Sequence, residues 1–198
     1  MIGKLFRKIK ESDFQKIGYS QEGEDILIDT LLNFKEKGFY VDVGAFHPFL
    51  ISNTYGFYKK GWTGINIDAK PGSMIPFNKH RPRDINLECG ISQSEEKLTY
   101  YSCNYPECNS FSFDSLEALM KKNFGLKILE EIQVETKKLA SVLKDNLLGN
   151  HIDLMSIDVE GYDLEVLQTN DWTLYRPDLL VVEMLHSSYS EVLEHPIT

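Results

Sequence analysis

Short apolar runs that end in an acidic residue recur along this chain and constrain its fold more than any other feature. Two of them lie in segment 39–68, FYVDVGAFHPFLISNTYGFYKKGWTGINID, separated by a turn and a short helical stretch. Two more, at 152–158 and 178–185, flank another helical stretch. Short runs that are apolar on both faces are typical of strands in a parallel sheet covered on both sides. The alternation predicts an α/β fold with an open, mostly parallel sheet and helices on both faces.

Periodicity and turn residues predict the other elements. A helix is expected over 20–34, with Leu27, Leu31 and Phe34 on one buried face. A longer helix is expected over 114–132, where the spacing of acidic residues suits a helix start. Further strands are predicted at 84–91, 97–103 and 132–136.

Length, charge and cysteine content exclude several classes of protein. The 198 residues suffice for one domain with a sizeable core, and a net charge of −9 argues against a nucleic-acid partner. No apolar run approaches the roughly 20 residues that span a bilayer, and the N-terminus lacks the apolar core of a signal peptide. Cys89, Cys103 and Cys108 are odd in number and lie in no zinc-binding pattern. We expect reduced thiols and a cytoplasmic protein.

The first 18 residues differ in charge from the rest of the chain. They hold five basic and two acidic residues, including the segment IGKLFRKIK. This pattern fits a basic amphipathic helix that attaches weakly to an anionic surface, and it also fits a solvated terminal helix. The predicted organisation is therefore a basic extension over 1–18 and one domain over 19–198.

Four of the predicted strands end in acidic residues. These residues are Asp42, Asp68, Asp158 with Glu160 two residues later, and Glu183. Ligands of open α/β sheets bind at the carboxyl ends of the strands, and a buried carboxylate there needs a partner. Four such acids on successive strands favour a ligand site over a set of caps and loop residues.

The turn DVGAFHP after the first strand limits the kind of ligand. It holds one glycine, Gly44, and neither GxGxxG nor GxxxxGK[ST] occurs in the chain. Those motifs bring the backbone against phosphates, so a cofactor without a pyrophosphate is favoured over NAD. S-adenosylmethionine meets this condition. Asp68 is the expected acceptor for its ribose hydroxyls.

Four segments, which follow one another from Tyr19 to Met184, resemble the FkbM family of S-adenosylmethionine-dependent methyltransferases. They are YSQEGEDILI, GFYVDVGAFHPFLISNTYGFYKKGWTGINIDAKP, IDLMSIDVEGYDLEVLQ and RPDLLVVEM. The resemblance implies a class I methyltransferase fold of Rossmann type. It also implies methyl transfer to a hydroxyl group, commonly of a sugar, a glycan or another natural product.

The resemblance assigns cofactor contacts to residues near the first two strands and in the leading segment. These are Gln21, Glu24, Asp42, Gly44, Ala45, Asn53, Thr54 and Asp68. The fold also has two closing strands after the strand that ends near Glu183. The 13 residues from His186 to Thr198 are too few for a helix and a strand hairpin, so we expect that hairpin to be missing or truncated.

Methyl transfer to a hydroxyl needs a group that takes the proton as the new bond forms. The candidates are Asp158, Glu160, Glu183 and His186. A divalent cation held by these acids is an alternative, but the spacing defines no ligand set and no metal site is predicted.

The other function that stays open is a non-catalytic cofactor-binding or scaffold protein. Four aromatic residues are expected either to line the acceptor site or to pack within an ordinary loop: Tyr100, Tyr101, Tyr105 and Phe111.

Overall fold

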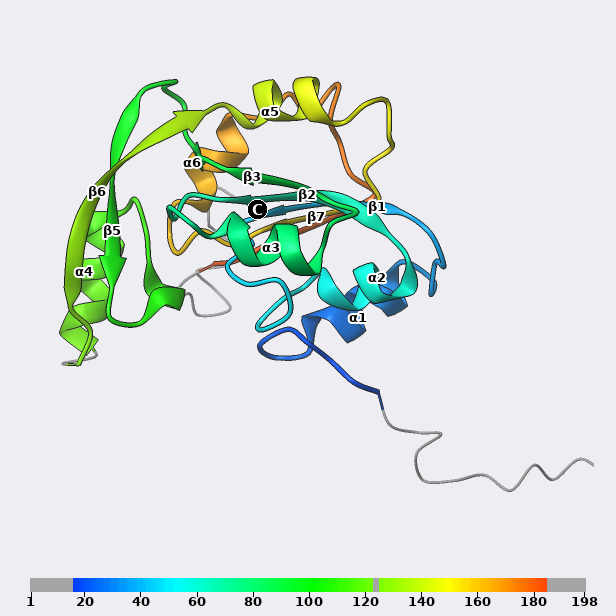
Figure 1. Cartoon of the computed structure of the whole chain (residues 1–198), viewed down its shortest axis with the longest axis horizontal. Coiled ribbons are helices and arrows are strands. Elements are labelled where there is room, and N and C mark those ends of the chain that lie inside the picture. The colour runs from blue at the N-terminus through cyan, green and yellow to red at the C-terminus, as the bar shows by residue number, and fades with distance from the viewer. Residues whose placement is uncertain (1–15, 123–124, 185–198) are drawn as a thin grey trace, which may run out of the picture.

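The computed structural model describes residues 16–122 and 125–184 and centres on a five-stranded parallel sheet (Figure 1). The order of its strands is β3-β2-β1-β7-β8, and every neighbouring pair is parallel. Their bounds are β1 Phe39–Val43, β2 Thr63–Asp68, β3 Ile85–Glu88, β7 Leu154–Ile157 and β8 Leu179–Val182. The predicted α/β fold with an open parallel sheet is confirmed.

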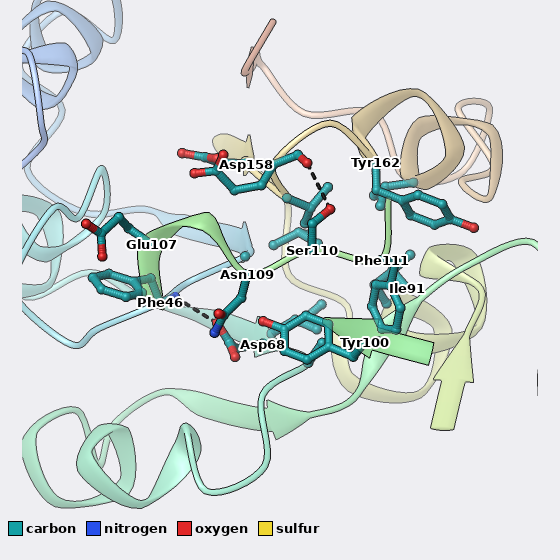
Figure 2. A pocket seen from close by; sticks show the side chains of 18 of the residues that line it. Phe46, Asp68, Ile91, Tyr100, Glu107, Asn109, Ser110, Phe111, Asp158 and Tyr162 are labelled. Atoms are coloured by element: carbon teal, nitrogen blue, oxygen red, sulfur yellow. Dashed lines mark hydrogen bonds between the residues drawn. The ribbon is translucent and has the colours of Figure 1, made fainter. Parts of the chain in front are cut away.

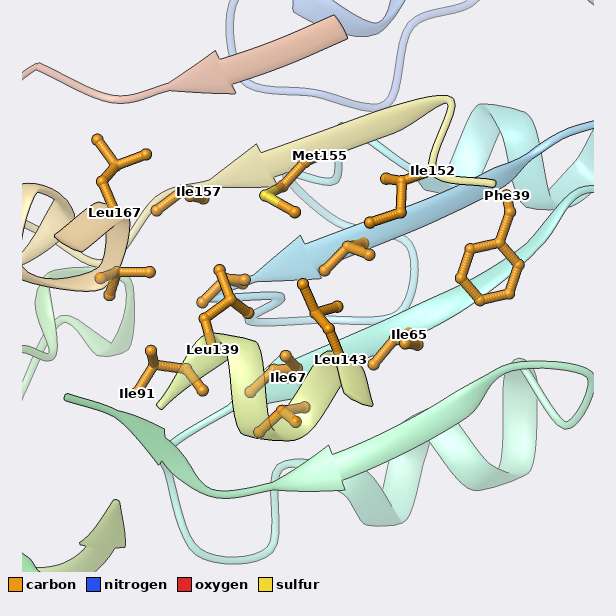
Figure 3. Packing of buried hydrophobic residues seen from close by; sticks show 14 residues of the cluster. Phe39, Ile65, Ile67, Ile91, Leu139, Leu143, Ile152, Met155, Ile157 and Leu167 are labelled. Atoms are coloured by element: carbon orange, nitrogen blue, oxygen red, sulfur yellow. The ribbon is translucent and has the colours of Figure 1, made fainter. Parts of the chain in front are cut away.

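Helices cover both faces of this sheet (Figure 1). On one face lie α1 (Glu24–Leu31), α2 (Tyr55–Lys60) and α3 (Met74–His80), and on the other lie α5 (Leu139–Asn146) and α6 (Asp163–Gln168). Alternate residues of β1 belong to two separate cores: Tyr40 packs with Phe57 and Trp62, whereas Val41 belongs to the cluster that contains Leu139 and Leu143. Figure 3 shows this second cluster, with Leu139 and Leu143 labelled on α5. All five residues of β1 are buried, as a strand covered on both sides requires.

A second, three-stranded sheet is inserted between β3 and α5. It contains β4 (Gly90–Ile91), β5 (Lys97–Cys103) and β6 (Ile128–Lys137), in the order β4-β6-β5. Strands β5 and β6 are antiparallel, and the connection between them carries the short 3-10 helix η2 (Pro106–Cys108) and α4 (Phe113–Lys122). We call residues 97–137 the insert. It stands beside the carboxyl ends of the main strands (Figure 1).

The prediction that Leu27, Leu31 and Phe34 form the buried face of the first helix is wrong. Leu27 is 60% exposed, Leu31 57% and Phe34 55%, whereas Ile28 is 2% exposed. The cause is Asp25, whose carboxylate accepts hydrogen bonds from the backbone N–H of Tyr19 and the hydroxyl of Ser20. These bonds turn the Asp25 and Ile28 side of the helix inward.

The helix expected over 114–132 is too long. Helix α4 ends at Lys122, and residues 128–132 belong to β6, together with the strand expected at 132–136. The pairing with β5 sets this conformation, because Ile128 and Ile132 lie opposite Cys103 and Tyr100 in the antiparallel ladder. The strand expected at 84–91 divides into β3 and β4. Within the described residues, no helix is long and apolar enough to cross a membrane.

Candidate functional site

A cavity opens where the carboxyl ends of β1, β2 and β7 face the insert. It has a volume of about 770 Å³ including its open mouth. Gly44, Asp68 and Asp158 line it from the strand ends or directly after them. Tyr100 and Phe111 line it from the insert (Figure 2). Because β1 and β7 lie side by side where the strand order reverses, the cavity occupies the position at which open α/β sheets bind ligands.

Gly44 permits the close approach of two strand ends beneath the cavity. Its φ is +83°, and its backbone N–H donates to the carbonyl of Ile67 at 2.9 Å. A Cβ atom at this position would lie 1.7 Å from the backbone oxygen of Asp158. Only glycine therefore fits between β1 and β7 here.

Asp68, at the end of β2, forms one polar end of the cavity. Its two carboxylate oxygens accept the backbone N–H groups of Phe46 at 3.0 Å and Lys70 at 2.8 Å. Burial raises the pKa of this carboxyl group, and these hydrogen bonds oppose the rise. The Tyr100 ring and the Asn109 side chain lie next to it (Figure 2), so the insert completes this end of the cavity.

Three acidic side chains converge near the other end. Asp158, Glu160 and Glu183 each place a carboxylate oxygen within 4.8 Å of the others, and we call them the acidic trio. Burial has the largest effect on the pKa of Glu160 and the negative charge of Asp158 the next largest, and together they raise this pKa to about 8. Burial also raises the pKa values of Asp158 and Glu183, whose carboxyl groups hydrogen-bond to each other. The trio can hold a proton near neutral pH, and its spacing would also suit a divalent cation.

Asp42 and Thr54 lie away from this cavity, in a buried polar network. The Thr54 hydroxyl donates to the Asp42 carboxylate at 2.6 Å, and the guanidinium group of Arg81 donates to Thr54 at 2.8 Å. Arg81 is fully buried and also donates to Ser52 and to the carbonyl of Pro48. The network supports the turn that precedes α2.

The other residues with an expected cofactor contact are spread around the site. Gln21 lines the cavity. Glu24 lies near enough to raise the pKa of Asp158, after the larger effect of burial. Ala45 is buried against Met74 and Phe77, and Asn53 donates to the hydroxyl of Ser156 at 3.0 Å. Neither Ala45 nor Asn53 is among the cavity-lining residues. His186 lies outside the described residues.

The insert supplies cavity residues that sequence reasoning missed. Glu107, Asn109 and Ser110 line the cavity, although their irregular segment has no periodicity that could place them. Tyr100 and Phe111 also line it, with ring centroids 5.0 Å apart. The two other tyrosines singled out from the sequence, Tyr101 and Tyr105, do not.

Comparison with known proteins identifies the family. The model of the methyltransferase FkbM domain matches residues 42–196, most of the chain. No curated protein and no solved structure matches the chain. The family match covers the end of β1, all of β2 and β7, the insert and the acidic trio. The chain therefore belongs to the FkbM methyltransferase family, and it is a methyltransferase.

Proposed function

We propose that the protein transfers a methyl group from S-adenosylmethionine to a hydroxyl group of a glycan or a small molecule. The observation that carries this proposal is one cavity lined by Asp68 at one end and by Asp158 and Glu160 of the acidic trio at the other. A carboxylate that can accept sugar hydroxyls and a proton acceptor of raised pKa then face the same cavity.

The residues of the cavity fit this cofactor. Gly44 leaves the backbone free of side-chain atoms at the turn after β1, and Asp68 offers carboxylate oxygens for a ribose diol. Asp158, at the other end, suits the positively charged ammonium and sulfonium groups of the cofactor. When bound, S-adenosylmethionine would supply an activated methyl group on its sulfonium centre.

Glu160 is the proposed proton acceptor. It lines the cavity, and a pKa of about 8 makes its carboxylate a stronger base than an ordinary one. In its ionised form it would accept the proton of the acceptor hydroxyl as the oxygen attacks. Asp158 and Glu183 hold a negative charge beside it that sustains this basicity. The buried ring of Tyr100 and the half-buried ring of Phe111 shield this part of the cavity from water.

The acceptor would enter at the mouth of the cavity. Gln21 and Glu107 line the cavity and offer hydrogen-bonding groups to a hydroxyl-rich molecule. A cytoplasmic location is part of this proposal and rests on the odd number and the spacing of the cysteines in the sequence. Weak attachment to an anionic surface through residues 1–18 stays a proposal, because most of that segment lies outside the described residues.

The test is a methyl-transfer assay with S-adenosylmethionine labelled at its methyl group, on a panel of glycans and hydroxylated natural products. We expect label in at least one hydroxyl acceptor. Glu160→Gln should lower turnover by about 10²–10⁴-fold and leave cofactor affinity nearly unchanged. Full turnover by Glu160→Gln would place the base elsewhere. Cofactor binding without label in any acceptor would favour the non-catalytic alternative.

A further inference from the structure

The backbone of Glu160 adopts a conformation that few residues with a side chain take. Its φ is +56°, and the next residue, Gly161, has a φ of +88°. Left-handed backbone is unfavourable for a residue other than glycine, asparagine or aspartate, and it persists where the surroundings enforce it. Specific contacts must therefore hold Glu160 in this turn.

Two groups from different parts of the chain hold the turn. The Asp163 carboxylate accepts the backbone N–H groups on either side, from Val159 at 3.2 Å and from Gly161 at 3.1 Å. The hydroxyl of Ser110 donates to the carbonyl of Glu160 itself at 2.9 Å (Figure 2). Asp163 belongs to α6, which follows the turn, whereas Ser110 belongs to the insert.

Ser110 is itself firmly placed. It is 1% exposed, and its backbone exchanges two hydrogen bonds with Tyr101 of β5, at 2.9 and 3.3 Å. Its hydroxyl oxygen accepts the backbone N–H of Ser112 at 2.9 Å. Because a serine hydroxyl has one proton, Ser110 commits that proton to Glu160.

We propose that Ser110 is a positioning residue that fixes the main chain of Glu160 and so keeps its carboxyl group at the cavity, beside Asp158. The catalytic meaning of this contact rests on the proposed function, in which Glu160 is the base. The insert then not only lines the cavity but also fixes the position of Glu160, the proposed proton acceptor. Ser110 itself touches no reacting atom.

A merely structural serine would affect stability alone, whereas a positioning serine must also change how Glu160 titrates. The charged groups around Glu160 are Asp158, Asp163, Glu107 and Glu183. The insert adds three titratable side chains, those of Tyr100, Cys103 and Cys108. If the turn relaxes, the Glu160 carboxyl moves toward water and away from these acids, so its titration midpoint falls. This shift can be measured without any acceptor.

The experiment compares Ser110→Ala and Ser110→Cys with the wild-type full chain. Ser112→Ala is the matched control, because the Ser112 hydroxyl contacts Ser115 rather than Glu160. Glutamate labelled with ¹³C at the carboxyl carbon reports the titration of Glu160, which Glu160→Gln identifies by the loss of its signal. Turnover and cofactor affinity are measured on the same proteins.

Ser110→Ala should lower the Glu160 midpoint by about 1 pH unit. It should also lower kcat by roughly 10- to 100-fold, with cofactor affinity unchanged. Ser110→Cys keeps a similar volume and a weak donor, so it should give an intermediate shift even if the alanine variant unfolds. An unchanged midpoint in folded Ser110→Ala or Ser110→Cys, or an equal shift in Ser112→Ala, would overturn the proposal. Absence of methyl transfer by wild type would overturn the proposed function instead, and the titration would still decide the role of Ser110.

Discussion

The Thr54 hydroxyl and the Asp42 carboxylate form a 2.6 Å hydrogen bond beneath the turn that follows β1. Thr54 is fully buried and Asp42 is 6% exposed. Arg81 donates to the same hydroxyl oxygen from α3's C-terminal side. Thr54 thus links a buried anion to a buried cation, and its hydroxyl serves both.

Thr54→Val should therefore lower the free energy of unfolding. The isosteric change leaves Asp42 and Arg81 each without one partner, at a cost of about 1–3 kcal/mol. Urea denaturation measures the loss, and Thr63→Val at the partly exposed start of β2 is the control, with an expected change within about 0.5 kcal/mol. Cofactor affinity of the folded variant should stay near that of wild type. A large loss of affinity at unchanged stability would instead place Thr54 in the cofactor site.

A pair of glycine variants should separate close packing from backbone preference. Gly44→Ala places a methyl group 1.7 Å from the Asp158 carbonyl oxygen, whereas Gly61→Ala, at a φ of +100°, meets nothing within 4 Å. We expect Gly61→Ala to destabilise the protein by about 1 kcal/mol and Gly44→Ala by about 3 kcal/mol or more. Thermal or urea unfolding provides both numbers. Equal losses would show that β1 and β7 do not need this close approach.

Short runs of apolar residues made the main sheet predictable. The segments at β1, β2, β7 and β8 are apolar and end in turn or acidic residues, so their strand character follows from local sequence. The site's place at their carboxyl ends then follows from the topology of such sheets.

Features that depend on tertiary contacts were not predictable. The face of α1 is set by Asp25, and residues 128–132 join β6 only because β5 lies opposite. The contact between Ser110 and Glu160 joins residues 50 positions apart. No local pattern in the sequence signals it, since neither residue lies in a regular element.

Asp68→Ala should weaken binding of S-adenosylmethionine by about 1–3 kcal/mol, because an acceptor for the ribose hydroxyls is lost. Calorimetric titration measures the change. Asp68 also accepts two backbone N–H groups, so unfolding curves must first show that the variant is folded. Glu88→Gln, on the neighbouring strand opposite Asp68, is the control and should bind like wild type. Equal affinity of the folded Asp68→Ala variant would remove Asp68 from the site.

The stability of the ligand-free protein should fall as the pH rises from about 4.5 to about 8. Glu160 keeps its proton in the folded state up to a pKa of about 8, whereas the unfolded chain releases it near 4.5. The folded state binds more protons within this window, so the free energy of unfolding decreases with pH. Asp163, with a pKa raised to about 7 mainly by burial, contributes with the same sign.

In Glu160→Gln, the free energy of unfolding should therefore decrease less steeply with pH than in wild type. Urea denaturation at a series of pH values measures this slope. Glu131→Gln, at an exposed position of β6, makes the same change of charge and should leave the slope as in wild type. A decline of equal steepness in Glu160→Gln would mean that Glu160 titrates normally in the folded protein.

Calorimetric titration of the wild-type protein with S-adenosylmethionine and, separately, with NAD tests the central claim most directly. The cavity between Asp68 and the acidic trio should bind S-adenosylmethionine at one site per chain. NAD should give no binding heat, because the turn at Gly44 lacks the spaced glycines that receive a pyrophosphate. Failure to bind S-adenosylmethionine, or equal binding of NAD, would contradict the account.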